Sequence, residues 1–223
     1  MTSPRLADRL TAVRSRIDAI ERSWSHPVRV VAVTKGFGPE VLQAALDANC
    51  DAVGENYAQE LLSKRSVIDD CPPARRPEVH FIGRLQSNKV RQLVGLIDVW
   101  STLDRSSLIK EISRRAPGAR VLVQVNTTGE EGKGGCPPDR VQELVVAARE
   151  AGLLVDGIMT VGPTGRPPED ARAGFRVARS LVDELGVEVC SMGMSADLPI
   201  AVEEGATEVR VGTTLFGPRP TSR

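Results

Sequence analysis

Residues 120–160 read RVLVQVNTTGEEGKGGCPPDRVQELVVAAREAGLLVDGIMT and contain the clearest fold pattern of the chain. Its two ends, Arg120–Asn126 and Leu154–Thr160, are short apolar runs rich in Val, Leu and Ile. Such continuous runs are typical of parallel strands that are covered on both faces. Between them, apolar residues recur at the three- and four-residue spacing of one helix face, at Val141, Leu144, Val145 and Ala148. The stretch therefore predicts two parallel strands joined by a crossover helix.

The same alternation extends from this unit in both directions along the chain. Six further candidate strands are Val28–Thr34, Asp51–Gly54, Val79–Gly83, Ile97–Ser101, Val187–Met192 and Thr207–Val211. Helical spacing separates them, for example at Phe175, Ala178, Val182 and Leu185. Eight such units in about 200 residues predict an α/β fold, a single (β/α)8 TIM barrel. A doubly wound open sheet is the alternative, because the number of strands does not by itself prove closure.

An extra helix is expected before the first strand, within residues 1–24. Ser3 is a candidate N-cap and Pro4 a candidate first helical residue. One face is apolar, with Leu6, Leu10, Val13, Ile17 and Ile20, and the other is rich in arginine. Acidic residues dilute the basic face, so a helix packed on the barrel is favoured over one lying on a membrane. With no linker that divides the chain, residues 1–223 are expected to form one domain.

Composition excludes several classes of function. The 29 Lys and Arg residues balance 29 Asp and Glu, and only 3% of the residues are aromatic, so no nucleic-acid partner is expected. Four separated cysteines and two histidines do not form a zinc motif, and free thiols are expected. No apolar run approaches the ~20 residues that span a bilayer, and no signal segment is visible. We therefore expect a cytoplasmic protein without a membrane partner.

The first candidate for chemistry is Lys35. Active sites of these barrels lie at the carboxyl ends of the strands, and Lys35 directly follows the apolar run Val30–Thr34. A solvated lysine at a strand end is the simpler interpretation. The alternative is a Schiff-base lysine, whose pKa is lowered by partial desolvation.

The last two strands strengthen the second interpretation. The loops that follow them contain Gly193 with Ser195, and Gly212 with Thr213. Phosphate sites of such barrels are commonly built there, and a helix start favours an anion. Each residue alone is equally well a turn glycine or an N-cap. Together with Lys35, the two loops predict a ligand that carries a phosphate and a carbonyl group.

Arg210 lies inside the last apolar strand, where an unpaired buried charge would be costly. It either faces a ligand or forms an ion pair with an acid such as Glu203 or Glu204. Asn56 follows the second strand and could bind a ligand oxygen or cap the next helix. His80 is more simply a core histidine than a base. The glycine-rich stretch around Lys133 lacks the spacing of a P-loop.

Four stretches carry a resemblance to a known family: AVTKG (32–36), GEN (54–56), HFIGRLQSNK (80–89) and SMGMSADLPIAVEEGATEVRVGTTLFG (191–217). On these motifs the chain resembles the pyridoxal 5′-phosphate (PLP) homeostasis proteins, single-domain relatives of the alanine racemase barrel. The resemblance runs over nearly the whole chain. It implies a PLP-binding barrel domain in which Lys35 holds PLP as an aldimine.

The resemblance also assigns the other cofactor-binding residues. Ser195, Gly212 and Thr213 would hold the phosphate, Arg210 would face the pyridine nitrogen, and Asn56 and Met194 would line the ring. The family often has a second lysine shortly after the first, whereas Phe37 and Gly38 stand there in this chain. Secondary lysine roles are therefore not carried over.

The expected function is a PLP-binding protein of vitamin B6 and amino-acid homeostasis, without efficient catalysis. Arg210 has donors only and cannot hold a proton on the ring nitrogen, which weakens PLP as an electron sink. Tyr57 is the chain's only tyrosine, and no second domain that could supply another base is expected. A low-activity PLP enzyme such as a racemase is the first alternative, and a cofactor-free Schiff-base lyase acting on a sugar phosphate is the second. Expected partners are PLP and PLP-dependent apo-enzymes, and the chain is expected to be a monomer or weak dimer.

Overall fold

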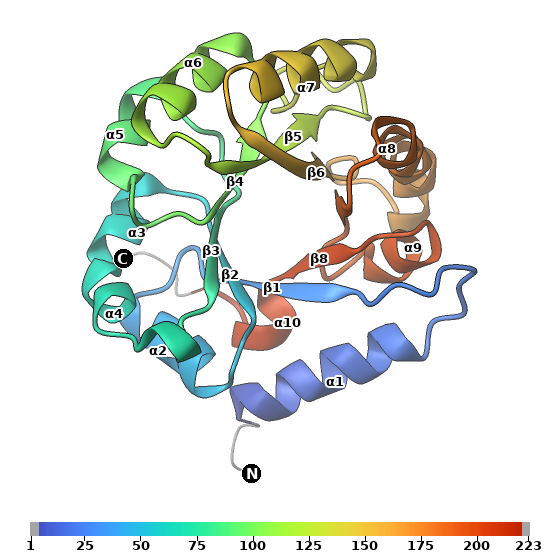
Figure 1. Ribbon diagram of the computed structural model, residues 1–223. Coiled ribbons are helices and arrows are strands. Elements are labelled where there is room, and N and C mark those ends of the chain that lie inside the picture. Colours follow the sequence, from blue (N-terminus) through green and yellow to red (C-terminus); the bar gives the residue numbers. More distant parts are fainter. Residues whose placement is uncertain (1–4, 220–223) are drawn as a thin grey trace.

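The protein is a closed barrel of parallel strands surrounded by helices (Figure 1). The computed structural model describes residues 5–219, and within them eight strands pair in chain order, with β1 against β8 closing the ring. The predicted (β/α)8 barrel is confirmed, and the open-sheet alternative is wrong. The strands are β1 Arg29–Val33, β2 Ala52–Glu55, β3 Glu78–Phe81, β4 Val99–Leu103, β5 Arg120–Val125, β6 Leu154–Thr160, β7 Val189–Ser191 and β8 Glu208–Val211.

Strand boundaries differ from the predicted ones by up to two residues. The clearest case is β7, which begins at Val189 and not at Val187. Gly186 ends the preceding helix in a left-handed conformation with φ of 60°, and the Val187 N–H donates back to Val182 O. Val187 therefore belongs to a helix C-cap, although its side chain continues the apolar pattern.

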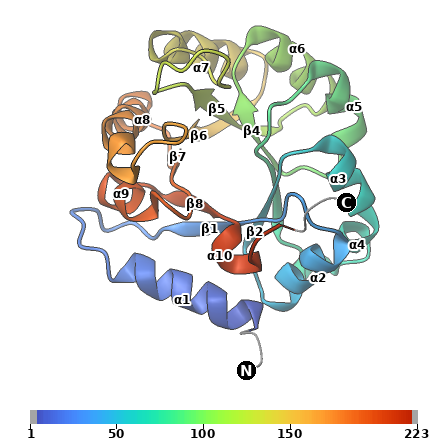
Figure 2. The same cartoon turned by 180° about the vertical axis from the view of Figure 1, so that it is seen from behind.

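Helices of very different length cover the outside of the barrel (Figures 1 and 2). They are α2 Pro39–Asp47, α3 Ala58–Ser63, α4 Arg65–Asp69, α5 Val90–Leu93, α6 Ser106–Arg115, α7 Val141–Glu150, α8 Arg172–Leu185, α9 Leu198–Glu203 and α10 Thr213–Phe216. Short 3-10 helices are η1 Pro73–Arg75, η2 Ser87–Lys89, η3 Pro138–Arg140 and η4 Pro168–Ala171. In α8, the buried residues Phe175, Ala178 and Val182 follow the predicted helical spacing.

The N-terminal helix α1 spans Leu6–Asp18 and lies along the outside of the barrel, below α10 in Figure 1. Its N-cap is Arg5, so the helix begins two residues later than the predicted start at Pro4. Ser3 and Pro4 themselves lie outside the described residues. The apolar face is buried at Leu10, Val13 and Ile17, which belong to the main hydrophobic core.

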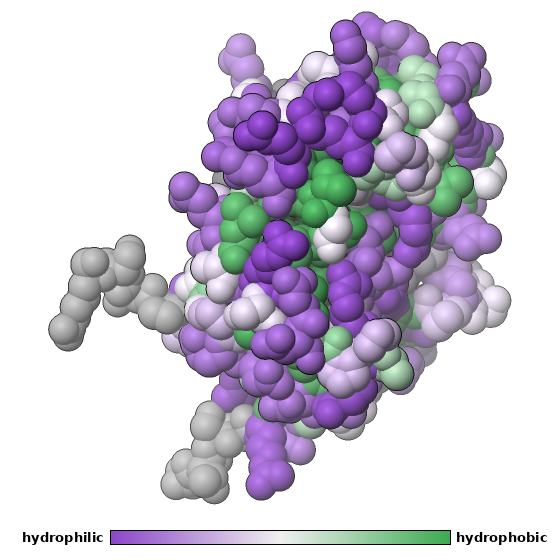
Figure 3. Space-filling model, turned by 60° about the vertical axis from the view of Figure 1, so that its left-hand side comes forward, coloured by the Kyte–Doolittle hydropathy of each residue, from purple (hydrophilic) through white to green (hydrophobic). Residues whose placement is uncertain are grey.

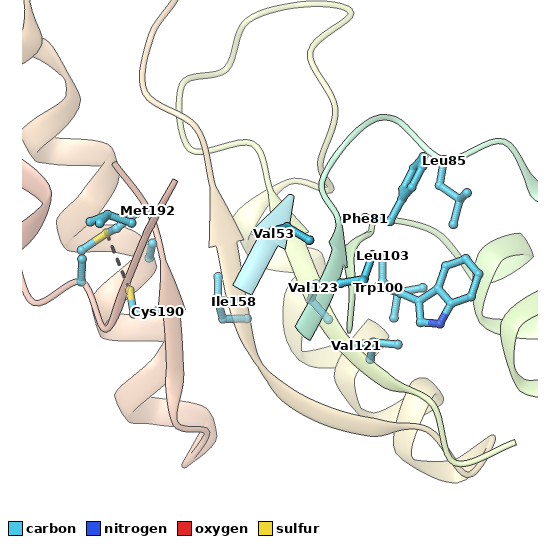
Figure 4. Close-up of a cluster of buried hydrophobic side chains, with 14 of the residues drawn as sticks. Val53, Phe81, Leu85, Trp100, Leu103, Val121, Val123, Ile158, Cys190 and Met192 are labelled. Carbon is cyan, nitrogen blue, oxygen red and sulfur yellow. Dashed lines mark hydrogen bonds between the residues drawn. The ribbon is translucent and has the colours of Figure 1, made fainter. Parts of the chain in front are cut away.

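The hydrophobic core lies mainly between the strands and the helices. Side chains alternate across each strand, so one set points outward to the helices and the other into the barrel. The outward set includes Phe81, Trp100 and Ile158, which belong to the buried apolar cluster of Figure 4. A separate small apolar cluster consists of Val99, Leu122 and Met159. Much of the remaining barrel interior is polar, which is unusual for a fold whose centre is normally filled by branched apolar residues.

A chain of polar side chains runs through this interior from the rim to the base. Arg210 Nη1 donates to Ser191 Oγ at 2.7 Å, and Ser191 Oγ donates to Glu208 Oε1 at 2.6 Å. His80 Nδ1 lies 3.8 Å from Glu208 Oε2, and His80 Nε2 lies 3.1 Å from Glu78 Oε2. His80 is therefore a buried core histidine with carboxylate partners, as its position in an apolar strand predicted.

The face seen in Figure 3 is mostly hydrophilic, with small apolar areas between the polar side chains. No described helix is long and apolar enough to cross a membrane. The described residues also contain no group of three or more His, Cys, Asp or Glu residues that could hold a metal ion. The four cysteines are free thiols, as predicted, and burial raises the pKa of Cys50 and of Cys136 to about 11.

Candidate functional site

A cavity of about 430 Å³ opens at the carboxyl ends of the strands, between β1, β2, β7 and β8. Its lining contains all seven residues that the sequence analysis proposed as ligand contacts: Lys35, Asn56, Met194, Ser195, Arg210, Gly212 and Thr213. Apolar side chains complete the wall, including Val33, Phe37, Ile82 and Val161. Closure of the barrel is what brings them together, because β1 and β8 are neighbours only in a ring.

Lys35 follows β1 and reaches the cavity as its candidate nucleophile. Its amine forms no hydrogen bond or ion pair with any residue between 5 and 219. Burial, and then the charges of Arg219 and Arg210, lower the pKa of Lys35, while Glu55 and Glu60 act against this shift. A lowered pKa increases the neutral fraction of the amine, which is the form that attacks a carbonyl carbon.

A fully buried ion pair lies directly beside this lysine. Lys64 Nζ donates to Glu55 Oε1 at 2.5 Å and to the Thr34 carbonyl oxygen at 2.8 Å. The Thr34 hydroxyl donates to the same Glu55 oxygen at 2.5 Å, and Glu55 Oε2 has no hydrogen-bond partner among the described residues. Burial raises the pKa of Glu55, which Lys64 and Thr34 partly offset. The pair joins the ends of β1 and β2, next to Lys35 and Asn56.

Arg210 is buried, with its guanidinium held by Ser191 Oγ at 2.7 Å and by the Thr160 carbonyl at 2.6 Å. The alternative of an ion pair with Glu203 or Glu204 is wrong, because those carboxylates bind Arg172. Burial lowers the pKa of Arg210, and no acid lines the cavity at its side among the described residues. A ligand atom opposite the guanidinium has to be a hydrogen-bond acceptor.

The loop after β7 is shaped by Gly193 and Asp197. Gly193 has φ of 88°, and a Cβ there would overlap with Ala201. Asp197 is the N-cap of α9, and its Oδ1 accepts a hydrogen bond from the Met194 N–H at 2.6 Å. Ser195 is therefore not the cap, and its hydroxyl has no partner among the described residues.

The loop after β8 supplies the matching donors. Gly212 is the N-cap of α10 and Thr213 its first residue, so their position leaves first-turn N–H groups without intrahelical partners. A Cβ on Gly212 would lie 3.3 Å from the Val33 carbonyl oxygen, a tight contact that favours glycine. Asn56, by contrast, is not a helix cap, since α3 begins after Tyr57. Hydroxyl and N–H donors thus gather at one end of the cavity.

Arg219 is the cavity residue that the sequence analysis missed. It lies after α10, and a Cβ on Gly36 would come within 2.8 Å of its Cδ. Arg219 stands two residues beyond Gly217, the end of the last family motif, and this proximity is the signal in the sequence that could have indicated it. Glu55 and Lys64 were also missed, because nothing in the sequence indicates that Lys64 is buried. Lys133 does not line this cavity and donates to the Gly162 carbonyl at 2.6 Å.

Comparison with known proteins identifies the family of this chain. The sequence matches the family described as "Alanine racemase, N-terminal domain" over residues 9–220. It is 41% identical to the pyridoxal phosphate homeostasis protein of Aquifex aeolicus, over 95% of this chain and 97% of that protein. The chain belongs to the pyridoxal phosphate homeostasis protein family. The human member of the family is 35% identical over 87% of this chain and 78% of that protein.

Solved structures agree with this assignment to the homeostasis family. PipY of Synechococcus elongatus, solved with PLP bound, superposes with a TM-score of 0.81 at 30% identity and covers 95% of this chain and 100% of that one. An alanine racemase of Clostridium difficile has a TM-score of 0.74 at 15% identity, covering 100% of this chain and 60% of that one. The racemase likeness shows the shared barrel fold alone.

The chemistry of the cavity is complementary to PLP. An aldehyde needs a neutral amine, which Lys35 offers, and a phosphate needs several donors, which the Ser195 and Thr213 loops offer. The pyridine nitrogen is an acceptor and matches the donors of Arg210. A cavity of about 430 Å³ also falls within the range usual for small-molecule sites. The donor set therefore fits this cofactor.

Proposed function

We propose that this member of the homeostasis family binds PLP in the cavity and acts as a PLP carrier in vitamin B6 and amino-acid homeostasis. The observation that carries the proposal is the position of Lys35. Its amine has a lowered pKa, has no partner among the described residues, and shares the cavity with the donors of two loops. This combination favours reversible capture of an aldehyde that also carries a phosphate.

The proposed roles follow from side-chain chemistry. Lys35 Nζ would hold PLP through its aldehyde carbon, with the aldehyde oxygen leaving as water, and Ser195, Gly212 and Thr213 would bind the phosphate. Arg210 donates to the ring nitrogen, while Asn56 and Met194 contact the ring. When bound, PLP supplies an electron sink for carbanion chemistry. This chain's own residues bind and orient it but do not protonate the ring nitrogen, since a guanidinium has no acceptor.

The cavity lining also supports a carrier over an efficient enzyme. Among the described residues that line it, none carries a carboxylate, an imidazole or a phenol, and its charged groups are Lys35, Arg210 and Arg219. Proton transfer at a substrate carbon needs a base within hydrogen-bond reach. Lys35 is the sole candidate in this lining, so a base for the opposite face of a substrate is missing. A low-activity racemase is the alternative, and turnover of amino acids would distinguish it.

The absorbance spectrum of the purified protein tests the proposal. We expect a PLP band that borohydride converts to a stable adduct on the peptide containing Lys35. Lys35→Ala should lose the band, and Lys110→Ala, an exposed control on α6, should keep it. Adduct found mainly on Lys89 or Lys133, or efficient turnover of common amino acids, would contradict the carrier assignment.

Several expectations stay predictions. The cytoplasmic location, the absence of nucleic-acid and membrane partners, and the monomeric or weakly dimeric state rest on composition and on the resemblance. Transfer of PLP to PLP-dependent apo-enzymes is a prediction of the same kind.

A further inference from the structure

A second and larger cavity, of about 810 Å³, lies beside the cofactor cavity at the rim. It is built by residues that follow β2, β3 and β4, and Asn56 lines both cavities. Around the rim, the hydroxyl-bearing loops of β7 and β8 come first, then Lys35 after β1, then Asn56, and then this second cavity. It therefore adjoins the lysine end of the proposed PLP site and not the phosphate end.

The second cavity has an excess of positive charge. Its lining includes three cations, Arg84, Lys89 and Arg105, and one acid, Asp104. Asp104 is already engaged, since Arg105 Nη1 lies 2.5 Å from its Oδ1 and the Gly135 N–H donates to its Oδ2. Arg105 Nη2 also donates to the Leu85 carbonyl at 2.6 Å. Asp104 and Arg105 are therefore held by each other and by backbone groups. The other two cations of the lining, Arg84 and Lys89, take no part in these contacts.

The side chains of Arg84 and Lys89 form no ion pair or hydrogen bond with any residue in the described range 5–219. The lining also offers an acceptor, because Asn56 Oδ1 is buried and has no hydrogen-bond partner in that range. Phe81 and Leu85 add apolar surface. Buried polar atoms are normally paired, so the unbonded oxygen is a sign of a missing ligand where the two cavities adjoin.

We propose that this second cavity binds a small carboxylate ligand through Arg84 and Lys89. Guanidinium and ammonium groups bind carboxylates through charge-assisted hydrogen bonds, and an apolar wall accommodates a short carbon chain. A simple carboxylic acid and a free amino acid share this chemistry. An amino acid would in addition offer an ammonium donor to Asn56 Oδ1. Carboxylate binding in this cavity does not depend on the proposed function.

The chain offers a built-in reporter for this cavity. Tyr57 is the only tyrosine of the sequence, lines the second cavity and is 56% exposed. Protein labelled with 3-fluorotyrosine should therefore give a single fluorine NMR resonance from the folded state. Titrating L-alanine, propionate and inorganic phosphate at equal ionic strength should move this resonance saturably with the two carboxylates. Tighter binding of L-alanine than of propionate would assign an amino acid, and equal binding a simple carboxylic acid.

Two variants locate the site. Arg84→Gln and Lys89→Met should each weaken carboxylate binding by about tenfold or more, since a hydrogen bond to a charged group is lost. Arg91→Gln is the matched control, because Arg91 is an exposed cation of α5 that does not line the cavity. The titration is repeated on Lys35→Ala, in which the shift should persist although PLP can no longer be held.

Three outcomes would overturn the proposal: no saturable shift, phosphate binding as tight as carboxylate binding, or equal affinity in Arg84→Gln and the unmodified protein. A persistent shift in a protein that shows no PLP band would refute the proposed function and leave this inference standing. A PLP band on Lys35 together with a silent fluorine resonance would do the reverse.

Discussion

Burial and the charges of the neighbouring side chains together set the reactivity of Lys35. Arg219 and Arg210 act with burial to lower the pKa of Lys35, and Glu55 and Glu60 oppose them. Because Arg210 is buried while Arg219 is exposed, Arg219 is the charge that can be removed without disturbing the barrel.

Arg219→Gln should raise the pKa of Lys35 towards its ordinary value. A higher pKa leaves less neutral amine at neutral pH, so PLP capture should slow there and become equal to that of the unmodified protein at high pH. Stopped-flow absorbance between about pH 6 and 10 measures this profile. Arg75→Gln, an exposed arginine of η1, is the control. An unchanged profile in Arg219→Gln would show that this charge does not reach Lys35.

Ser195→Ala should weaken PLP binding by about tenfold or more, because a hydrogen bond to a charged group is worth about 1.5–3 kcal/mol. Pyridoxal, which lacks the phosphate, should bind nearly as before. Equilibrium titration by absorbance gives both affinities. Equal weakening of the two ligands would place the Ser195 hydroxyl away from the phosphate.

At the scale of elements, the Glu55–Lys64 pair holds the ends of β1 and β2 together. Lys64 bonds to the Thr34 carbonyl of one strand end and to the Glu55 carboxylate of the other. The two side chains are 0% and 1% exposed, so neither charge is compensated by water. Burying a charge is costly unless it is paired, and the pair is therefore coupled to the strand ends that carry Lys35 and Asn56.

Lys64→Met should destabilise the fold by about 3–5 kcal/mol, because it leaves the Glu55 carboxylate buried and unpaired. The double variant Glu55→Gln with Lys64→Met should lose less, since both charges are removed together. Urea unfolding followed by circular dichroism gives the free energies of unfolding. A double variant as unstable as Lys64→Met alone would mean that the charges are not coupled.

At the scale of the whole molecule, the polar chain through the barrel ends at Glu78 on its base. A hydrogen bond from His80, and the guanidinium groups of Arg120 and Arg29, hold the pKa of Glu78 well below its ordinary value. The unfolded chain takes up this proton first as the pH falls. The stability that Glu78 contributes is therefore complete near neutral pH and is lost progressively in acid.

Glu78→Gln should lower the free energy of unfolding at pH 7 by about 1.5–3 kcal/mol. The difference from the unmodified protein should shrink as the pH falls below about 4.3, the ordinary pKa of a glutamate. Urea unfolding at several pH values measures it. Glu143→Gln, an exposed surface glutamate of α7, should change little. A difference independent of pH would show that the Glu78 charge is not what stabilises the base.

The eight strand and helix units and the main part of the candidate site could be predicted from the sequence, whereas closure of the barrel could not. Its apolar runs of four to seven residues, each followed by helical spacing, are local patterns that any parallel strand covered on both faces must show. Lys35, Arg210 and Ser195 could be predicted as ligand contacts because Lys35 stands at a strand end and the other two lie within the motif 191–217. Such positions depend only on neighbouring residues in the chain, so they can be read from the sequence.

Which side chains contact one another could be seen only in the folded barrel. Ring closure places β8 beside β1 and brings Arg210 and Arg219 near Lys35. Folding also buries Lys64 against the end of β1, and no apolar pattern in the sequence predicts this contact. The unpaired cations Arg84 and Lys89 likewise became visible only when every partner within residues 5–219 was known. The physical reason is that charges and hydrogen bonds depend on distances of a few ångströms between residues far apart in the chain, and those distances exist only after the barrel has closed.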